Sequence, residues 1–105
     1  MSEYIQIITT VDEKEYAKRI SDELVKERLA ACVQIIGPIE STYRWEGNIE
    51  HSEEFICLIK SKRIKFKEVE KAVKHIHPYE NPEIISVPIV NGSKEYLNWI
   101  EEVLE

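Results

Sequence analysis

The 105-residue chain contains few of the residues on which many functional sites depend. It has only two cysteines, Cys32 and Cys57, and only three glycines. The cysteines do not form a CxxC redox pair, and we expect both to pack in the core as small hydrophobic residues. Three separated glycines cannot form a glycine-rich phosphate loop, and no HExxH motif occurs. These absences argue against dithiol redox chemistry, phosphate-loop nucleotide binding and zinc-protease chemistry.

Long apolar segments and an excess of basic charge are also missing. No apolar segment approaches the roughly 18 residues that a membrane-spanning helix needs, so we expect no membrane association. The first residues show neither the basic nor the apolar region of a signal peptide, which favours a cytoplasmic protein with reduced thiols. The formal net charge is −6, which argues against a nucleic-acid partner.

The sequence contains no arrangement of side chains that is typical of catalysis. No serine lies in the strained strand–turn–helix that exposes a nucleophile in hydrolases. The adjacent carboxylates of Glu53 and Glu54 lie in a predicted strand, where successive side chains point to opposite faces. They therefore cannot act together on one substrate. We expect no enzymatic activity.

Residues 31–61 contain the most distinctive pattern, two long strand-like segments that meet near Gly47-Asn48. This pair signals a two-residue hairpin turn, because glycine adopts the positive φ that such a turn needs. Gly37-Pro38 interrupts the first segment and predicts a β-bulge, since proline cannot donate a ladder hydrogen bond. Each arm exceeds the usual strand length of about five or six residues. We therefore expect the distal half, residues 40–54, to pack against another copy of the chain.

The rest of the chain predicts alternating strands and helices. Apolar, β-branched segments at residues 4–10 and 83–90 are typical of strands, and a proline places the second of them at a sheet edge. Amphipathic helices are expected after a capping Asp12, from about Ile64, and after a capping Ser93.

The resulting order is β-α-β-β-α-β with a C-terminal helix, which is the split βαβ, ferredoxin-like plan. We therefore expect an α+β fold with an antiparallel sheet, in a single domain that spans residues 1–105. Two helices can cover one face of this sheet, but strands that are apolar on both sides need cover on both faces. The pattern thus predicts an oligomer in which the sheets of several chains meet.

Several side chains of the predicted hairpin are candidates for a pocket or an interface. Tyr43 and Trp45 share the apolar face near the hairpin tip, where we expect one chain to supply few core residues for them to pack against. Aromatic side chains are favoured where an apolar surface meets a wet edge. Glu54 and Lys60 have the same strand parity, so both can face one side, which favours a polar pocket.

A connector with two prolines, residues 77–83, follows the second predicted helix and begins with His77. Copper and zinc prefer imidazole and thiolate ligands, but a histidine here can also fix the connector by hydrogen bonds. The sequence leaves both roles open. Tyr79, Glu80 and Asn81 lie between the prolines, where they form either a pocket wall or a stiff connector.

Several spaced motifs together resemble the CutA divalent-cation-tolerance family. They are AACV at residues 30–33, S-x-Y-x-W-x-G at 41–47, Glu54 with Lys60-Ser61, HPYxxPEI at 77–84 and YLxWI at 96–100. The resemblance covers about residues 4–103, nearly the whole chain. It implies a ferredoxin-like subunit of a compact homotrimer that acts in the response to metal ions.

The resemblance also implies a ligand. Some members of this family bind copper, so a divalent cation, copper foremost, is expected as a non-obligatory partner, with His77 as its ligand. In members with a proposed metal site, a cysteine lies on the first strand and two adjacent histidines precede Pro-Tyr. Here Ile8 and Ile76 occupy two of those positions, and only His77 matches the pattern.

The implied trimer also resembles that of the PII signalling proteins, which bind small effectors between subunits. This likeness suggests an alternative function, a PII-like module that binds a small ligand in inter-subunit clefts. The residues expected to line the clefts or the trimer interface are Tyr43, Trp45, Glu54, Lys60 and Tyr79.

Overall fold

The computed structural model describes residues 3–105, and its elements follow the predicted order, with one short 3-10 turn added. They are β1 (Tyr4–Val11), α1 (Lys14–Lys26), β2 (Cys32–Trp45), β3 (Asn48–Lys62), the 3-10 turn η1 (Arg63–Lys65), α2 (Phe66–Ile76), β4 (Ile84–Pro88) and α3 (Lys94–Val103). The four strands form one antiparallel sheet in the order β2-β3-β1-β4. The predicted α+β, ferredoxin-like architecture is therefore confirmed.

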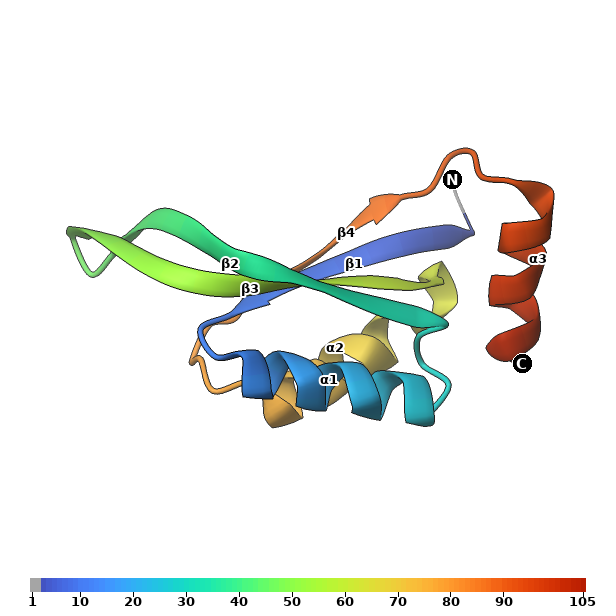
Figure 1. The fold of residues 1–105 in the computed structure, drawn as a ribbon, viewed down its shortest axis with the longest axis horizontal. Coiled ribbons are helices and arrows are strands. Elements are labelled where there is room, and N and C mark those ends of the chain that lie inside the picture. The colour runs from blue at the N-terminus through green and yellow to red at the C-terminus, as the bar shows by residue number, and fades with distance from the viewer. Residues whose placement is uncertain (1–2) are drawn as a thin grey trace.

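The helices cover only one face of the sheet. Figure 1 shows α1 and α2 side by side beneath the strands, whereas α3 stands at the end of the sheet that lies opposite the hairpin tip. Among residues 3–105, no helix lies on the face of the sheet that points away from α1 and α2. β4 forms an edge of the sheet, as its proline predicted, with Pro88 opposite Ile5 of β1.

The hydrophobic core lies between the sheet and the helices α1 and α2. Alternate residues of β1 point into it, and Ile7 and Val11 are completely buried. Ile20 of α1 and Val73 of α2 meet them from the helical side. Each of these side chains contributes roughly 1.5–3 kcal/mol by leaving water, so the apolar stripes of the two helices fix how they dock.

The hairpin of β2 and β3 is interrupted where the sequence predicts it. The strand register shifts between Ile36 and Ile39, which confirms the bulge at Gly37-Pro38. The turn lies one residue earlier than predicted, because Trp45 pairs with Asn48 and leaves Glu46 and Gly47 as the two central residues. Both have a positive φ, 49° and 83°, as a primed two-residue turn requires.

The two predicted helix caps have different outcomes. Ser93 caps α3, and its Oγ accepts a hydrogen bond from the Tyr96 N–H. The Asp12 cap was wrong, because α1 begins at Lys14 after Glu13, which makes no side-chain capping bond. β1 pairs with β3 as far as Val11, the chain bends at Asp12, and Glu13 is the extended residue that precedes the helix.

An ion pair attaches α3 to the end of the sheet. Lys62 Nζ at the end of β3 donates to Glu101 Oε2 at 2.8 Å, and the Tyr4 hydroxyl donates to Glu101 Oε1 at 3.0 Å. The hydrogen bond with Lys62 holds the pKa of Glu101 below its usual value, and the same bond raises the pKa of Lys62. The C-terminal helix is thus fixed to both central strands.

One buried hydroxyl in the core predicts a stabilising substitution. Thr9 of β1 is fully buried, and its Oγ1 has no hydrogen-bond partner among residues 3–105. Replacement by valine removes this unpaired polar group, so Thr9→Val is expected to raise the free energy of unfolding by about 1 kcal/mol. The matched control is Thr10→Val, which loses a bond to Glu83 and should not stabilise the protein. Thermal unfolding measures both, and a lower melting temperature for Thr9→Val would contradict the prediction.

Candidate functional site

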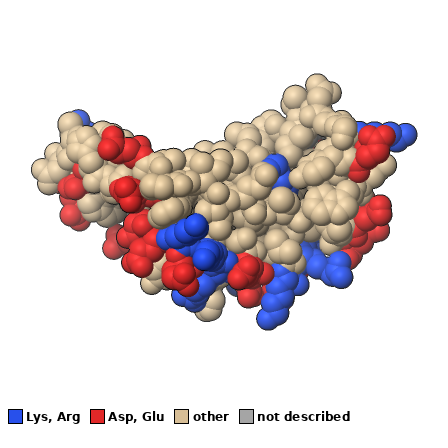
Figure 2. Space-filling model, viewed as in Figure 1, with Lys and Arg blue, Asp and Glu red and all other residues tan. Residues whose placement is uncertain are grey.

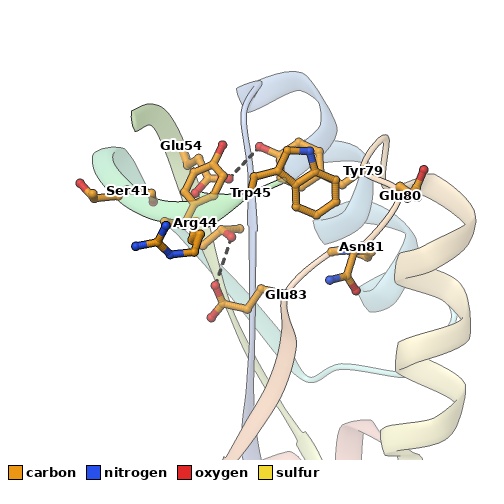
Figure 3. Close-up of a pocket in the computed structure, with 12 residues that line it drawn as sticks. Ser41, Arg44, Trp45, Glu54, Tyr79, Glu80, Asn81 and Glu83 are labelled. Atoms are coloured by element: carbon orange, nitrogen blue, oxygen red, sulfur yellow. Dashed lines mark hydrogen bonds between the residues drawn. The ribbon is translucent and has the colours of Figure 1, made fainter. Parts of the chain in front are cut away.

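A cleft of about 680 Å³ lies between the distal half of the hairpin and the connector that follows α2 (Figure 3). The hairpin forms one wall, and residues 79–83 form the other. Thr10, near the end of β1, lies between them. The residues that line the cleft are Thr10, Ser41, Thr42, Tyr43, Arg44, Trp45, Glu54, Tyr79, Glu80, Asn81, Pro82 and Glu83.

His77 fixes the connector to the sheet. Its Nδ1 accepts a hydrogen bond from the Tyr79 N–H at 3.2 Å, so the ring proton must lie on Nε2. Nε2 donates this proton to the Thr10 carbonyl at 2.7 Å. Both ring nitrogens are thus engaged, which is the connector-fixing role that the sequence left open.

The environment of His77 favours a neutral ring. Its side chain is buried, and this burial is the main reason why its pKa lies below the usual value of 6.5. The hydrogen bond to Thr10 and the carboxylates of Asp12 and Glu54 act in the opposite direction but do not reverse the shift. A neutral ring keeps one donor and one acceptor, as its two hydrogen bonds require.

The residues of one chain do not fit a bound metal ion. Across residues 3–105, no three or more His, Cys, Asp or Glu side chains form a group that could hold one. Cys57 lies in the core, and burial raises its pKa to about 11, whereas Cys32 is only half-buried and lies on the opposite face of the sheet. His51 lies on the hairpin, where its Nδ1 contacts Thr42 Oγ1 at 3.2 Å. The role of His77 as a metal ligand therefore stays a prediction.

Glu54 and Tyr79, which are far apart in the sequence, meet in the cleft. The Tyr79 hydroxyl donates a hydrogen bond of 2.7 Å to Glu54 Oε2 (Figure 3). Burial, followed by this bond, holds the pKa of Tyr79 well above its usual value, so the phenol keeps its proton. The Tyr79 ring also stands edge-to-face against the His77 ring, at a centroid distance of 4.7 Å. His77 therefore positions Tyr79, and Tyr79 positions the Glu54 carboxylate.

The remaining predicted site residues fall in two places. Tyr43 and Trp45 line the hairpin wall of the cleft and are 44% and 41% exposed. Lys60 shares the sheet face of Glu54, but it does not line the cleft. Its Nζ donates to Gln34 Oε1 at 2.6 Å, farther along the sheet.

Sequence reasoning did not find the contact between Thr10 and Glu83. Thr10 Oγ1 donates to Glu83 Oε1 at 3.3 Å, which joins β1 to the end of the connector. The signal was indirect, because only the pairing of β4 with β1 brings these two residues together. Glu80 and Asn81, in contrast, line the cleft wall that the pair of prolines suggested.

The strand order and the single-sided helix layer place the chain among the ferredoxin-like α+β proteins. The family described as CutA1 divalent ion tolerance protein matches residues 5–103. The chain belongs to this family, as its spaced motifs indicated.

Similar proteins cover nearly the same length. The divalent-cation tolerance protein CutA of Thermus thermophilus is 42% identical over 96 residues, which are 91% of this chain and 93% of that protein. The corresponding protein of Archaeoglobus fulgidus is 44% identical over 99 residues, 94% of this chain and 96% of the relative. The crystal structure of CutA from Xylella fastidiosa superposes with a TM-score of 0.96 at 38% identity, covering 99% of this chain and 100% of the other. The divalent cation tolerance protein structure from Thermus thermophilus gives 0.94 at 39% identity, covering 97% and 99%.

The helices within residues 3–105 are short and amphipathic. None is long and apolar enough to cross a lipid bilayer.

The lowered pKa of His77 predicts a pH-dependent stability. Between this pKa and the unfolded value of about 6.5, the unfolded chain binds more protons than the folded one. The free energy of unfolding should therefore be fully retained above about pH 6.5 and decrease as the pH falls through the lowered pKa. Urea unfolding from about pH 8 to about pH 5 measures this slope.

Two glutamine variants test the assignment of this slope to His77. His77→Gln should reduce it, because glutamine does not titrate. His75→Gln is the matched control, because it removes a histidine that is exposed on the surface of α2. An unchanged slope in His77→Gln would assign the pH dependence to other groups.

Proposed function

We propose that the protein acts in divalent-cation tolerance as a cytoplasmic homotrimer without catalytic activity. Membership of the divalent ion tolerance family supports the role in the response to metal ions. The main support for an oligomer is the sheet face that no helix of residues 3–105 covers, because apolar side chains on this face are exposed to solvent. The number of three subunits comes from the family resemblance.

The open face of the sheet has the character of an interface. Ile36 of β2 is 48% exposed, and Ile85 and Val87 of β4 are 49% and 40% exposed. Figure 2 shows acidic and basic side chains mainly near the hairpin tip, on the helical side and near α3, and few over the middle of the molecule. A second copy would cover this apolar surface without burying many charges.

The edges of the sheet support the same assembly. β2 is an edge strand of 14 residues, and β4 is the other edge. Long unpaired edges are normally paired or covered in native proteins. A closed ring of copies would cover both edges and the hairpin, including the half-exposed Trp45.

The proposal also includes metal binding by the trimer. A divalent ion such as Cu(II) would be bound weakly, with His77 as the candidate ligand. Because both ring nitrogens of His77 already form hydrogen bonds, one of these bonds has to break before the ring can bind a metal ion. Since one chain lacks a ligand cluster among its described residues, further ligands have to come from other copies.

The cleft favours a second candidate function, a PII-like module that binds a small ligand. Its volume of about 680 Å³ lies in the range of roughly 300–1,000 Å³ that is typical of small-molecule sites. Its lining combines aromatic rings with a few polar groups that His77 and the paired prolines hold in place. This alternative places the response to metal ions downstream of ligand binding.

The compartment stays a prediction. The names of its relatives indicate different compartments: the protein of Arabidopsis thaliana is called chloroplastic and that of Archaeoglobus fulgidus periplasmic. We propose the cytoplasm on the basis of the two free cysteines.

Trp45 tests the proposed assembly. If its ring is buried between copies, Trp45→Ala should weaken the assembly by about 3–5 kcal/mol, the usual cost of truncating a buried aromatic side chain. Light scattering over a dilution series measures the mass, and thermal unfolding measures the stability. The matched control is Arg44→Ala, because Arg44 has the opposite strand parity. An unchanged mass and melting temperature in Trp45→Ala would show that this ring lies outside the interface.

Calorimetric titration with Cu(II) tests metal binding. We expect weak but saturable binding to the assembled protein, with a whole-number ratio of ions to trimers confirmed by light scattering in the same buffer. His77→Gln should reduce this binding, whereas His75→Gln should leave it unchanged. Equal copper binding by His77→Gln and the parent would remove His77 as the ligand, and uptake without fixed stoichiometry would favour the cleft alternative.

A further inference from the structure

The charges that line the cleft are unbalanced. Three of its residues are acidic, namely Glu54, Glu80 and Glu83, and Arg44 is the one basic residue of the lining. Arg44 alternates along β2 with Tyr43 and Trp45, so its side chain belongs to the other face of the strand. Figure 3 shows its guanidinium group pointing away from Trp45 and Tyr79. The interior of the cleft is therefore acidic.

Glu54 is the carboxylate that lies deepest in the cleft. Its residue is only 6% exposed, although acidic side chains are rarely buried without a positive partner. One of its oxygens, Oε2, accepts the hydrogen bond from Tyr79. Within residues 3–105 the other oxygen has no hydrogen bond, and neither oxygen forms an ion pair. Among the described residues, Glu54 thus has no positively charged partner.

The Tyr79 hydroxyl binds this carboxylate, and the rings of Tyr43 and Trp45 line the same cleft farther toward the hairpin tip. In one chain, Tyr43 and Trp45 are 44% and 41% exposed and line the cleft, so under the second candidate function their rings face a ligand rather than another copy. Aromatic faces attract cations through the ring quadrupole. Their arrangement beside Glu54 and Tyr79 is typical of sites that hold the charged end and the apolar body of one molecule.

The carboxylates of this cleft are not arranged to bind a metal ion. No group of three or more acidic, histidine or cysteine side chains among the described residues could hold an ion, so the three carboxylates of the cleft do not converge. An organic cation differs because its N–H groups can donate to one carboxylate while its carbon chain contacts the rings.

We propose that the cleft binds a small organic cation, a primary amine or a guanidinium compound, whose nitrogen donates to Glu54 and whose apolar part packs on Tyr43 and Trp45. The proposal rests on the second candidate function above, ligand binding in the cleft, and names the chemical class of that ligand. Tyr79 acts as a positioning residue, because its hydroxyl orients the Glu54 carboxylate.

Three probes of the same length but different charge test the proposal. They are n-butylammonium, butan-1-ol and butanoate, titrated into the full-length protein in its native assembly. Binding is followed by the NMR chemical shifts of the two indole N–H groups and by calorimetry. We expect saturable binding of n-butylammonium with a shift of one indole signal, and at least tenfold weaker binding of the other two probes.

Two variants assign the site. Glu54→Gln removes the negative charge but keeps a carbonyl oxygen that can accept the Tyr79 hydrogen bond, and it should weaken n-butylammonium binding at least tenfold. The matched control is Glu53→Gln, which removes the same charge from the adjacent residue, whose side chain does not line the cleft. It should bind like the parent.

The results of these titrations distinguish the cationic class of the ligand from ligand binding in the cleft as such. Binding of butanoate or butan-1-ol as strong as that of n-butylammonium would overturn the cationic class but leave ligand binding in the cleft intact. Equal binding of n-butylammonium by Glu54→Gln and the parent would overturn the role of Glu54. The absence of binding by all three probes would overturn both proposals, as expected if a lysine or arginine of another copy fills the cleft.

Discussion

The hydrogen bond from His77 Nε2 to the Thr10 carbonyl is the contact on which the site depends. It joins the first residue after α2 to β1 and so fixes where the connector begins. From this anchor, the Nδ1 bond to the Tyr79 N–H and the edge-to-face ring contact place Tyr79 against Glu54. A neutral imidazole suits this role because it offers one donor and one acceptor in opposite directions.

This contact explains why a histidine in a metal-tolerance protein need not be a metal ligand in each chain. The two nitrogens that would bind an ion hold the cleft wall instead, and the soft ligands Cys32, Cys57 and His51 lie at separate places in the fold. Among the described residues, the Glu54 carboxylate is buried and has no charged partner. The chemistry of one chain therefore favours a ligand that brings its own hydrogen-bond donors.

The second constraint is that the strands are apolar on both sides while the helices cover one side. The packing of α1 and α2 buries Ile7, Val11 and their neighbours, but it leaves Ile36 and Ile85 half-exposed. Residues 3–105 contain no further element that covers them, since α3 stands at the end of the sheet, where Lys62 and Glu101 hold it. The proposed assembly surface and the cleft thus lie on the same open side of one sheet.

Local sequence patterns determined the order of the elements, the bulge at Gly37-Pro38, the Ser93 cap and the family. These features depend on residues close together in the chain, where periodicity and turn chemistry act directly. Only the tertiary structure decided where α1 begins, because β1 pairs with β3 as far as Val11 and the helix starts at Lys14 after Glu13. It also decided the site: the bonds from His77 to Thr10 and from Tyr79 to Glu54 join residues 67 and 25 positions apart. No local pattern records such contacts, since they follow from strand order and register.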